Sequence, residues 1–213
     1  MSIVVIDYGS GNLKSAAKAL EVAVNNINLN EKVIVSSNPK IIKESKKIIL
    51  PGQGSFRDCY LGIKKISGLE DILNELVLVK KKPILGICVG MQLFAKTGYE
   101  SQQTKGFGWI DGEVRKINNI NKTLKLPHMG WNEIVFKENT KLFANLKNKS
   151  HMYFIHSYEL ITKQKNSIVA TTTYGNSIIA SVEKENIFGT QFHPEKSQKN
   201  GLVILENFLR LGL

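Results

Sequence analysis

The chain has 213 residues, of which 42% are hydrophobic, and its 29 basic and 18 acidic residues give a formal net charge of +11. A chain of this length buries a sizeable core, and we expect one domain over residues 1–213. No apolar stretch approaches the roughly 20 residues of a membrane span, and no basic region precedes the apolar residues 3–6. We therefore expect neither a membrane span nor a signal peptide.

The positive charge does not by itself indicate nucleic-acid binding. Only Arg57, Arg115 and Arg210 are arginine, the residue suited to paired contacts with phosphate and guanine. The lysines are scattered, so we expect a solvated basic surface, with an acidic partner surface or an anionic substrate as the alternatives. The cysteines, Cys59 and Cys88, form no disulfide framework, and the histidines and cysteines lack metal-ligand spacing. The composition predicts a cytoplasmic protein that binds no nucleic acid, metal or cofactor.

The first half of the chain alternates between strand-like and helix-like segments. Residues 3–7 form a strand-like run, and residues 13–24 carry apolar side chains at helical spacing. Pro39 separates two strand-like segments, residues 32–36 and 47–50. A helical stretch over residues 63–81, interrupted by Gly68, and a further strand over residues 84–87 follow. This order predicts an α/β fold with a mostly parallel central sheet and helices on both faces.

Beyond Gly106 the pattern changes to short β-like segments. They are residues 109–117, 132–136, 152–161, 167–173, 178–183 and 187–191. Turn residues separate them at 118–119, 174–176 and 185–186, and a final helix is expected over residues 201–210. We predict that these strands are antiparallel and extend the sheet in the C-terminal half.

The segment around Cys88 is the most informative motif. An apolar run reaches Cys88, which has Gly86 and Gly90 two residues to either side, and the helix-compatible residues 91–95 follow. This is the pattern of a nucleophile elbow with cysteine in place of serine, where a buried strand turns sharply into a helix. The dipole at a helix N-terminus favours the reactive thiolate. The alternative is a buried structural cysteine between two packing glycines.

Two further motifs supply the groups that a cysteine nucleophile needs. His193 and Glu195 flank Pro194, and an imidazole oriented by a carboxylate can serve as the base. The turn at residues 51–54, Pro-Gly-Gln-Gly, can aim backbone N–H groups at one point, as an oxyanion hole requires. The alternative for His193 to Glu195 is a surface turn, and the alternative for residues 51–54 is an ordinary strand-to-helix connection.

Together these motifs resemble those of class I, triad-type glutamine amidotransferases, a family with a flavodoxin-like α/β fold. Three segments narrow the resemblance: Asp-Tyr-Gly-Ser-Gly-Asn at 7–12, Pro-His-Met-Gly-Trp-Asn at 127–132 and Tyr-Phe-Ile-His-Ser-Tyr at 153–158. They resemble the glutamine amidotransferase subunits of imidazole glycerol phosphate synthase, which act in histidine biosynthesis. The chain departs from the usual Pro-Gly-Val-Gly turn at Gln53. In the family this turn reorients on activation, so the departure bears on gating.

The resemblance implies glutamine hydrolysis by a triad of Cys88, His193 and Glu195. The thiolate of Cys88 attacks the side-chain amide, while His193 protonates the departing ammonia and later activates water. Glu195 orients His193. Backbone N–H groups near Gly52 and Val89 are the implied oxyanion donors.

The resemblance also implies that Gln92, Ser157 and Tyr158 bind the glutamine substrate. The alternatives are a polar Gln92 that satisfies nearby backbone groups, and plain strand alternation at Ser157 and Tyr158. His128 and His156 could form a second dyad, but positioned structural histidines are the favoured interpretation.

Partner contacts are implied at Asn12, Trp131, Tyr153 and Lys196, which match positions facing a cyclase (β/α)8-barrel subunit. In the family the two subunits form a heterodimer, and ammonia passes to the cyclase, which makes imidazole glycerol phosphate and AICAR. The alternatives are a loop asparagine, core aromatic residues and a surface lysine.

Three other functions compete with this interpretation. A paralogous amidotransferase would supply ammonia for amidination of a surface nucleotide sugar, an alternative prompted by Gln53. A non-catalytic scaffold would have no need for the intact triad residues. A related cysteine hydrolase of peptides or γ-glutamyl chains would lack the segment at residues 127–132.

Overall fold

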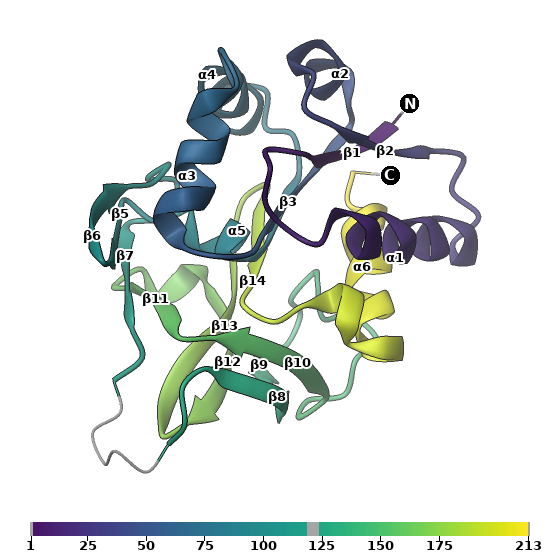
Figure 1. The fold of residues 1–213 in the computed structure, drawn as a ribbon. Helices are drawn as coiled ribbons and strands as arrows, with labels where there is room; N and C mark the ends of the chain where they lie inside the picture. The colour runs from purple at the N-terminus through teal and green to yellow at the C-terminus, as the bar shows by residue number, and fades with distance from the viewer. Residues whose placement is uncertain (1, 119–123, 213) are drawn as a thin grey trace.

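The computed structural model describes residues 2–118 and 124–212. Its centre is an eight-stranded sheet of order β2-β1-β3-β4-β14-β13-β12-β9 (Figure 1). The first five strands in this order are parallel: β2 (Lys32–Ser36), β1 (Ser2–Ile6), β3 (Lys47–Gly52), β4 (Ile84–Cys88) and β14 (Ile187–Thr190). The last three are antiparallel: β13 (Asn176–Lys184), β12 (Ile168–Tyr174) and β9 (Val135–Phe136). The predicted mostly parallel sheet is confirmed.

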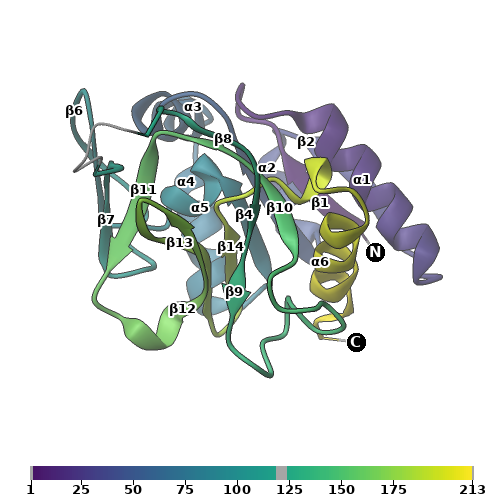
Figure 2. The ribbon, with the colours of Figure 1, turned by 90° about the horizontal axis from the view of Figure 1, so that it is seen from below.

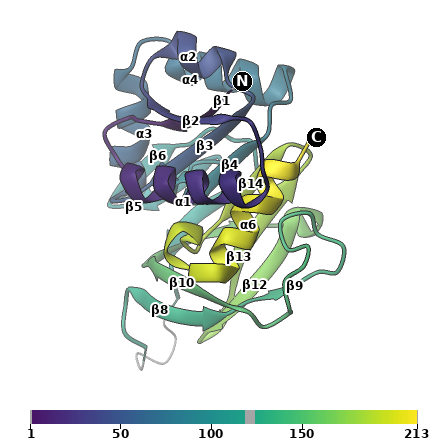
Figure 3. The same ribbon diagram turned by 90° about the vertical axis from the view of Figure 1, so that its right-hand side faces the viewer.

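Helices cover both faces of the sheet (Figures 1 and 3). α1 (Leu13–Asn26) and α6 (Gln198–Arg210) pack side by side on one face, and α3 (Phe56–Lys65) and α4 (Leu69–Asn74) lie on the other. The buried residues of α1 recur at helical spacing, which gives this helix one apolar stripe. Strands β1, β3 and β4 are apolar along almost their whole length, as expected for parallel strands buried on both faces.

The ends of the parallel strands bring three distant parts of the chain together. Gly52 at the end of β3 stands opposite Cys88 at the end of β4, and Thr190 of β14 stands opposite Ile87. The chain leaving β14 then reaches His193. In open α/β sheets, a crevice at the carboxyl ends of the strands is the usual place for a ligand.

Part of the C-terminal half forms two smaller sheets, so the prediction that all its strands extend the main sheet is wrong (Figure 2). One pairs β8 (His128–Glu133) with β10 (His151–His156); the other has the order β11 (Tyr158–Thr162), β7 (Gly112–Lys116), β5 (Thr97–Glu100), β6 (Gln102–Lys105). The predicted strand over 152–161 is divided at Ser157, and its halves join different sheets. Residues 132–136 are likewise shared between β8 and β9. Apolar alternation identifies a strand but does not reveal where its pairing partner changes.

Several helix boundaries also differ from the prediction. Pro39 starts the short helix α2 (Pro39–Glu44) because a proline fits the first helical position, where its missing N–H is not needed. Gly68, with φ of 73°, does separate two helices, but the first of them begins at Phe56 behind a Ser55 cap. After α4 the chain continues as a π-helical turn, Glu75–Val79.

The remaining expectations concern single segments. The helix after the elbow, α5 (Val89–Gln92), is one turn long and does not reach residue 95. The hairpin of β5 and β6 was not predicted, because its residues are mostly polar and exposed. The turn expected at 118–119 lies partly outside the described residues. Within residues 2–118 and 124–212, no helix has the length and apolarity needed to cross a bilayer.

Burial of Glu159 predicts a measurable pH dependence of stability. Glu159 lies on β11, and burial raises the pKa of its carboxyl group to about 7. Between its ordinary pKa of 4.5 and about 7, the folded state holds a proton that the unfolded state releases, so stability falls as the pH rises through this window. Glu159→Gln removes this loss. We expect the variant to match wild type at pH 4 and to exceed it by about 1–3 kcal/mol at pH 8.

Urea unfolding at both pH values checks this prediction. Glu44→Gln at the exposed end of α2 is the control, and we expect a smaller difference between pH 4 and pH 8 than for Glu159→Gln. Equal effects of Glu159→Gln at the two pH values would contradict the prediction.

Candidate active site

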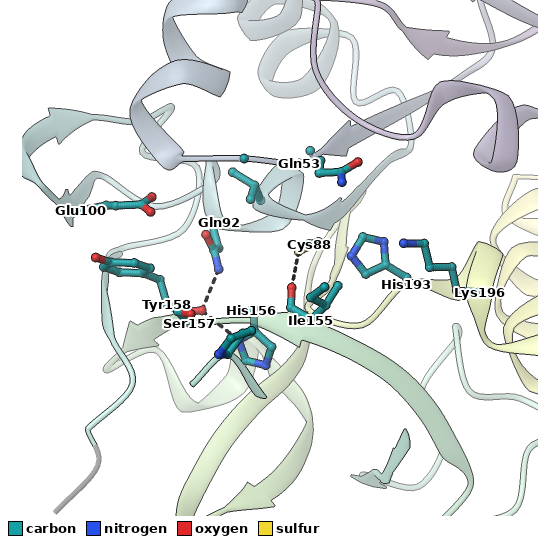
Figure 4. Close-up of a pocket in the computed structure, with 14 residues that line it drawn as sticks. Gln53, Cys88, Gln92, Glu100, Ile155, His156, Ser157, Tyr158, His193 and Lys196 are labelled. Carbon is teal, nitrogen blue, oxygen red and sulfur yellow. Dashed lines mark hydrogen bonds between the residues drawn. The ribbon is translucent and has the colours of Figure 1, made fainter. Parts of the chain in front are cut away.

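A cavity of about 310 Å³ lies at the carboxyl ends of β3, β4 and β14 (Figure 4). Seven of the eight residues predicted for catalysis, oxyanion binding and substrate binding line it: Gly52, Cys88, Val89, Gln92, Ser157, Tyr158 and His193. The eighth, Glu195, lies behind His193 and has a buried side chain. Four segments that are distant in the sequence therefore meet at one site.

The backbone at Cys88 is in an unusual conformation. Cys88 has φ of 55° and ψ of −113°, between the end of β4 and the start of α5. Such values cost a residue with a side chain on the order of 1–3 kcal/mol, and they are concentrated at functional sites. The turn exists because bare backbone packs around it: a Cβ at Gly90 would lie 1.8 Å from the carbonyl oxygen of Leu50. The sharp turn presents the side chain of Cys88 to the cavity.

His193 links Cys88 to Glu195. Its Nδ1 lies 2.7 Å from Oε1 of Glu195, and His193 lines the cavity together with Cys88. Burial alone lowers the pKa of His193, but the interactions of the ring with Cys88 and Glu195 outweigh it and raise this pKa to about 10. A protonated imidazole next to the sulfur stabilises a thiolate. Since α5 has only 4 residues, its dipole contributes less than the prediction assumed.

The glycine turn at the end of β3 is held by hydrogen bonds from residues that do not line the cavity. The hydroxyl of Tyr8 donates to the carbonyl oxygen of Pro51 at 2.5 Å. Ser10 bonds both backbone groups of Gln53: its Oγ lies 3.3 Å from the nitrogen and also donates to the oxygen. The thiol of Cys59 donates to the same oxygen at 3.4 Å. In this arrangement the N–H of Gln53 points to Ser10 and is not an oxyanion donor.

The predicted substrate residues differ in their hydrogen bonds within the protein and in their positions on the strands. Nε2 of Gln92 donates to the carbonyl oxygen of Tyr158 at 2.8 Å and to Oε1 of Gln191 at 3.0 Å. The amide nitrogen thus satisfies protein acceptors, as the alternative interpretation had it, while the residue still lines the cavity. Ser157 lies at the break between β10 and β11, not inside a strand, and Tyr158 begins β11.

His128 and His156 form a buried pair in which Nδ1 of His128 lies 3.0 Å from Nε2 of His156. The ring of His128 is stacked between those of Phe154 and Tyr174. Burial lowers the pKa of each histidine to about 4, so both rings are neutral at pH 7. This agrees with structural histidines.

The residues missed from the sequence include one that lines the cavity and one that is buried next to the sulfur. Glu100, at the end of β5, lines the cavity and accepts a hydrogen bond from the N–H of Phe56 at 2.7 Å. It was missed because its hairpin was not predicted. Gln191 is fully buried, and its Nε2 lies 3.7 Å from the sulfur of Cys88. It was missed because it reaches the sulfur only when strands that are distant in the sequence come together.

Three of the four predicted partner residues lie together on the surface. The rings of Trp131 and Tyr153 are 6.0 Å apart, and Nζ of Lys196 is 5.8 Å from the centroid of Tyr153. Trp131 is 47% exposed, so it is not a core aromatic residue. Asn12 caps α1, and its side chain accepts a hydrogen bond from the N–H of Ser15. Among the residues that the structure describes, no group of three or more His, Cys, Asp or Glu side chains could hold a metal ion.

Comparison with known proteins agrees with this fold. The family model of glutamine amidotransferase class-I matches residues 4–211. Two solved structures share the fold. One is a glutamine amidotransferase with a TM-score of 0.68 and 16% identity, over 96% of this chain and 98% of that one. The other is a glutamine amidotransferase from Thermotoga maritima with a TM-score of 0.64 and 17% identity, over 94% of this chain and 80% of that one. The chain belongs to the class I glutamine amidotransferases.

Closer relatives specify the branch of this class. The chain is 54% identical to the imidazole glycerol phosphate synthase subunit HisH of Pelagibacter ubique, over 99% of this chain and 100% of that protein. It is 46% identical to the HisH subunit of Bradyrhizobium diazoefficiens, over 99% of each. Within the class, it belongs to the HisH subunits, and it is an enzyme subunit of the glutamine amidotransferase type.

The contact at Gly90 predicts a strong effect of one methyl group. In Gly90→Ala the added Cβ meets the carbonyl oxygen of Leu50 at 1.8 Å, and neither backbone can yield without moving β3 or β4. We expect a loss of about 3 kcal/mol or more in the free energy of unfolding. Gly68→Ala is the control, since it meets no atom within 4 Å and costs only the φ penalty of about 1–2 kcal/mol. Chemical denaturation of both variants checks this, and equal losses would contradict it.

Proposed function

We propose that this chain is the glutaminase of imidazole glycerol phosphate synthase in histidine biosynthesis, and that it passes ammonia to a cyclase subunit. The observation that carries the proposal is the meeting of Cys88 and His193 at one cavity, with Glu195 bonded to the far side of the His193 ring. The eight-stranded sheet, which runs through both halves of the chain, supports a single domain over residues 1–213. The two free cysteines suit the reducing cytoplasm where we expect it to work.

The reaction follows from the protonation states of the triad. The thiolate of Cys88 attacks the side-chain carbon of glutamine, and the carbonyl oxygen takes up the negative charge. His193 then gives its proton to the departing nitrogen, which leaves as ammonia, and a thioester remains on Cys88. Neutral His193 takes a proton from water, the water oxygen attacks the thioester, and glutamate is released. Glu195 keeps the ring oriented through its contact with Nδ1.

Backbone N–H groups stabilise the oxygen of the tetrahedral intermediate. The N–H of Val89, which follows the nucleophile at the start of α5, is the first donor we assign, and the backbone near Gly52 supplies the second. The N–H of Gln53 is engaged by Ser10, so it joins only if that peptide reorients. Since one oxyanion donor is worth about 2.7–4 kcal/mol, such reorientation gives a partner a point of control over the rate.

The cavity is arranged for the two ends of a glutamine molecule. His193 and Lys196 lie on one side of Cys88, and Gln92, Tyr158 and Glu100 lie on the other (Figure 4). A glutamine whose amide faces Cys88 extends its α-carbon toward this second side. We assign Glu100 to the α-ammonium group, because it supplies the negative charge there. Gln92, Ser157 and Tyr158 line the space for the rest of the substrate.

The surface formed by Trp131, Tyr153 and Lys196 is the proposed contact with the cyclase barrel, together with Asn12. Lys196 belongs both to this surface and to the cavity lining, so the cavity opens next to the proposed interface. Ammonia released there has a short path into a partner. In this proposal the two subunits form a heterodimer.

Glutamine turnover with and without the partner tests the proposal. Glutaminase rate is measured for the chain alone, with its candidate cyclase, and with the cyclase and its nucleotide ligand. We expect stimulation in the complete mixture, and we expect the gene pair to rescue a histidine auxotroph. Stimulation without rescue would favour the paralogue that serves a nucleotide sugar, and no stimulation would contradict the synthase assignment.

Substitutions in the triad separate the roles of its members. Cys88→Ala should abolish glutaminase activity while the complex still assembles. Glu195→Gln should keep the geometry but lower kcat by about 100-fold to 10,000-fold, because an amide neither holds the reactive tautomer of the ring nor stabilises its protonated form. Activity of Cys88→Ala at the wild-type level would rule out the mechanism, and failure to assemble would point to a damaged fold.

Glu100→Gln tests the assignment of the α-ammonium group. We expect KM for glutamine to rise about tenfold or more with a smaller change in kcat, since a hydrogen bond to a charged group is lost away from the reacting bond. 4-Carbamoylbutanoate, which lacks the α-amino group, is the matched control. Wild type and variant should process it equally, and an equal difference for both substrates would refute the assignment.

A further inference from the structure

A buried side-chain amide donates a hydrogen bond to the sulfur of Cys88. Nε2 of Gln191 lies 3.7 Å from Sγ, and the carbonyl oxygen of Ile155 lies 3.8 Å from it. A carbonyl oxygen stabilises only the protonated thiol, to which it is an acceptor. An amide N–H stabilises the negatively charged sulfur, because a thiolate accepts hydrogen bonds. The contact with Gln191 therefore favours the reactive state.

The orientation of the Gln191 amide is fixed by its other end. Oε1 of Gln191 accepts a hydrogen bond from Nε2 of Gln92 at 3.0 Å, so Nε2 of Gln191 must face the sulfur. The second N–H of Gln92 donates to the carbonyl oxygen of Tyr158 at 2.8 Å. Both hydrogens of the Gln92 amide are thus used, and neither amide can rotate without breaking a buried hydrogen bond. Gln191 is 0% exposed and Gln92 2%.

The same carbonyl connects this pair to the two buried histidines. Nδ1 of His156 lies 2.9 Å from the oxygen of Tyr158, and since a carbonyl only accepts, Nδ1 carries the hydrogen. Nε2 of the neutral His156 ring then accepts from Nδ1 of His128, at 3.0 Å. Nε2 of His128 accepts in turn from Nδ2 of Asn132, at 3.2 Å. Donors and acceptors are consistent from Asn132 to the sulfur (Figure 4 shows the part from His156 to Gln92).

We propose that Gln191 is a further catalytic residue, whose side-chain N–H stabilises the thiolate of Cys88 in the position for attack. The hydrogen-bonded chain from Gln92 to Asn132 holds the amide in the orientation that this role requires. The proposal rests on the proposed function, in which the same sulfur attacks glutamine. It gives the two histidines a positioning role in place of a second catalytic dyad.

Alkylation of Cys88 by iodoacetamide tests the proposal without any glutamine. The rate constant is measured by intact mass on the full chain across pH, with Cys88→Ala as the blank for Cys59. We expect Gln191→Leu to alkylate about tenfold more slowly at pH 7 because a donor to the charged sulfur is lost. The titratable groups that face the sulfur or its cavity are Tyr8, Cys59, Glu100, His156, Tyr158, His193 and Lys196.

Gln191→Glu is a second variant, isosteric with glutamine, that keeps the test decisive if Gln191→Leu lowers stability. The carboxylate keeps an acceptor for Gln92 but places a negative charge next to the sulfur, so alkylation should slow at least as much as in the leucine variant. In glutamine turnover, both variants should lose kcat more than they raise KM. Asn207→Asp is the matched control: Asn207 is a buried amide on α6 that donates to the carbonyl oxygens of Leu142 and Ala144. It should lower stability without slowing alkylation.

Wild-type alkylation rates in both Gln191 variants would overturn the proposal and leave Gln191 as a packing residue. Equal slowing in Asn207→Asp would overturn it as well, because a general loosening of the fold would then explain the effect. A chain that alkylates as expected but does not hydrolyse glutamine would contradict the proposed function and not this inference. Thermal unfolding of each variant shows which fraction is folded at the assay temperature.

Discussion

The site depends on how closely the end of β3 approaches the turn after β4. A Cβ at Gly52 would lie 2.4 Å from the nitrogen of Gly90, and one at Gly90 would lie 1.8 Å from the oxygen of Leu50. Only bare backbone fits at this contact, and it holds Cys88 at a φ that a side chain otherwise avoids. The strain cannot relax unless a strand in the middle of the sheet moves. Packing of the sheet, rather than any polar contact, thus fixes the direction of the sulfur.

The charged groups at the site stabilise one another. The side chains of His193 and Glu195 are 6% and 3% exposed, and Oε2 of Glu195 has no hydrogen-bond partner among the described residues. A buried carboxylate is costly unless a cation compensates it, and the contact with His193 supplies that compensation. Glu195 therefore favours the protonated imidazole, which in turn favours a thiolate at Cys88. Burial makes the three groups act as one unit.

Sequence patterns anticipated the parallel half of the fold better than the rest. Its strands are apolar on both faces and alternate with helices, so local pattern and topology agree. In the antiparallel half, Ser157 divides a continuous β-like run between two sheets, and pairing partners are set by contacts distant in the sequence. The same limit applies to the site. Cys88 and His193 stand in motifs, whereas the buried position of Gln191 next to the sulfur appears only once the strands are assembled.

The two faces of β8 and β10 connect the proposed interface to the sulfur of Cys88. Side chains on a strand alternate between faces, so Trp131 and Tyr153 point outward while His128 and His156 point inward. The outward residues form the surface proposed for the cyclase, and the inward residues belong to the hydrogen-bonded chain that ends at Cys88. Because both sets stand on the same two paired strands, a displacement of this small sheet by a partner also moves the inner chain. A partner that leaves β8 and β10 in place leaves the chain intact.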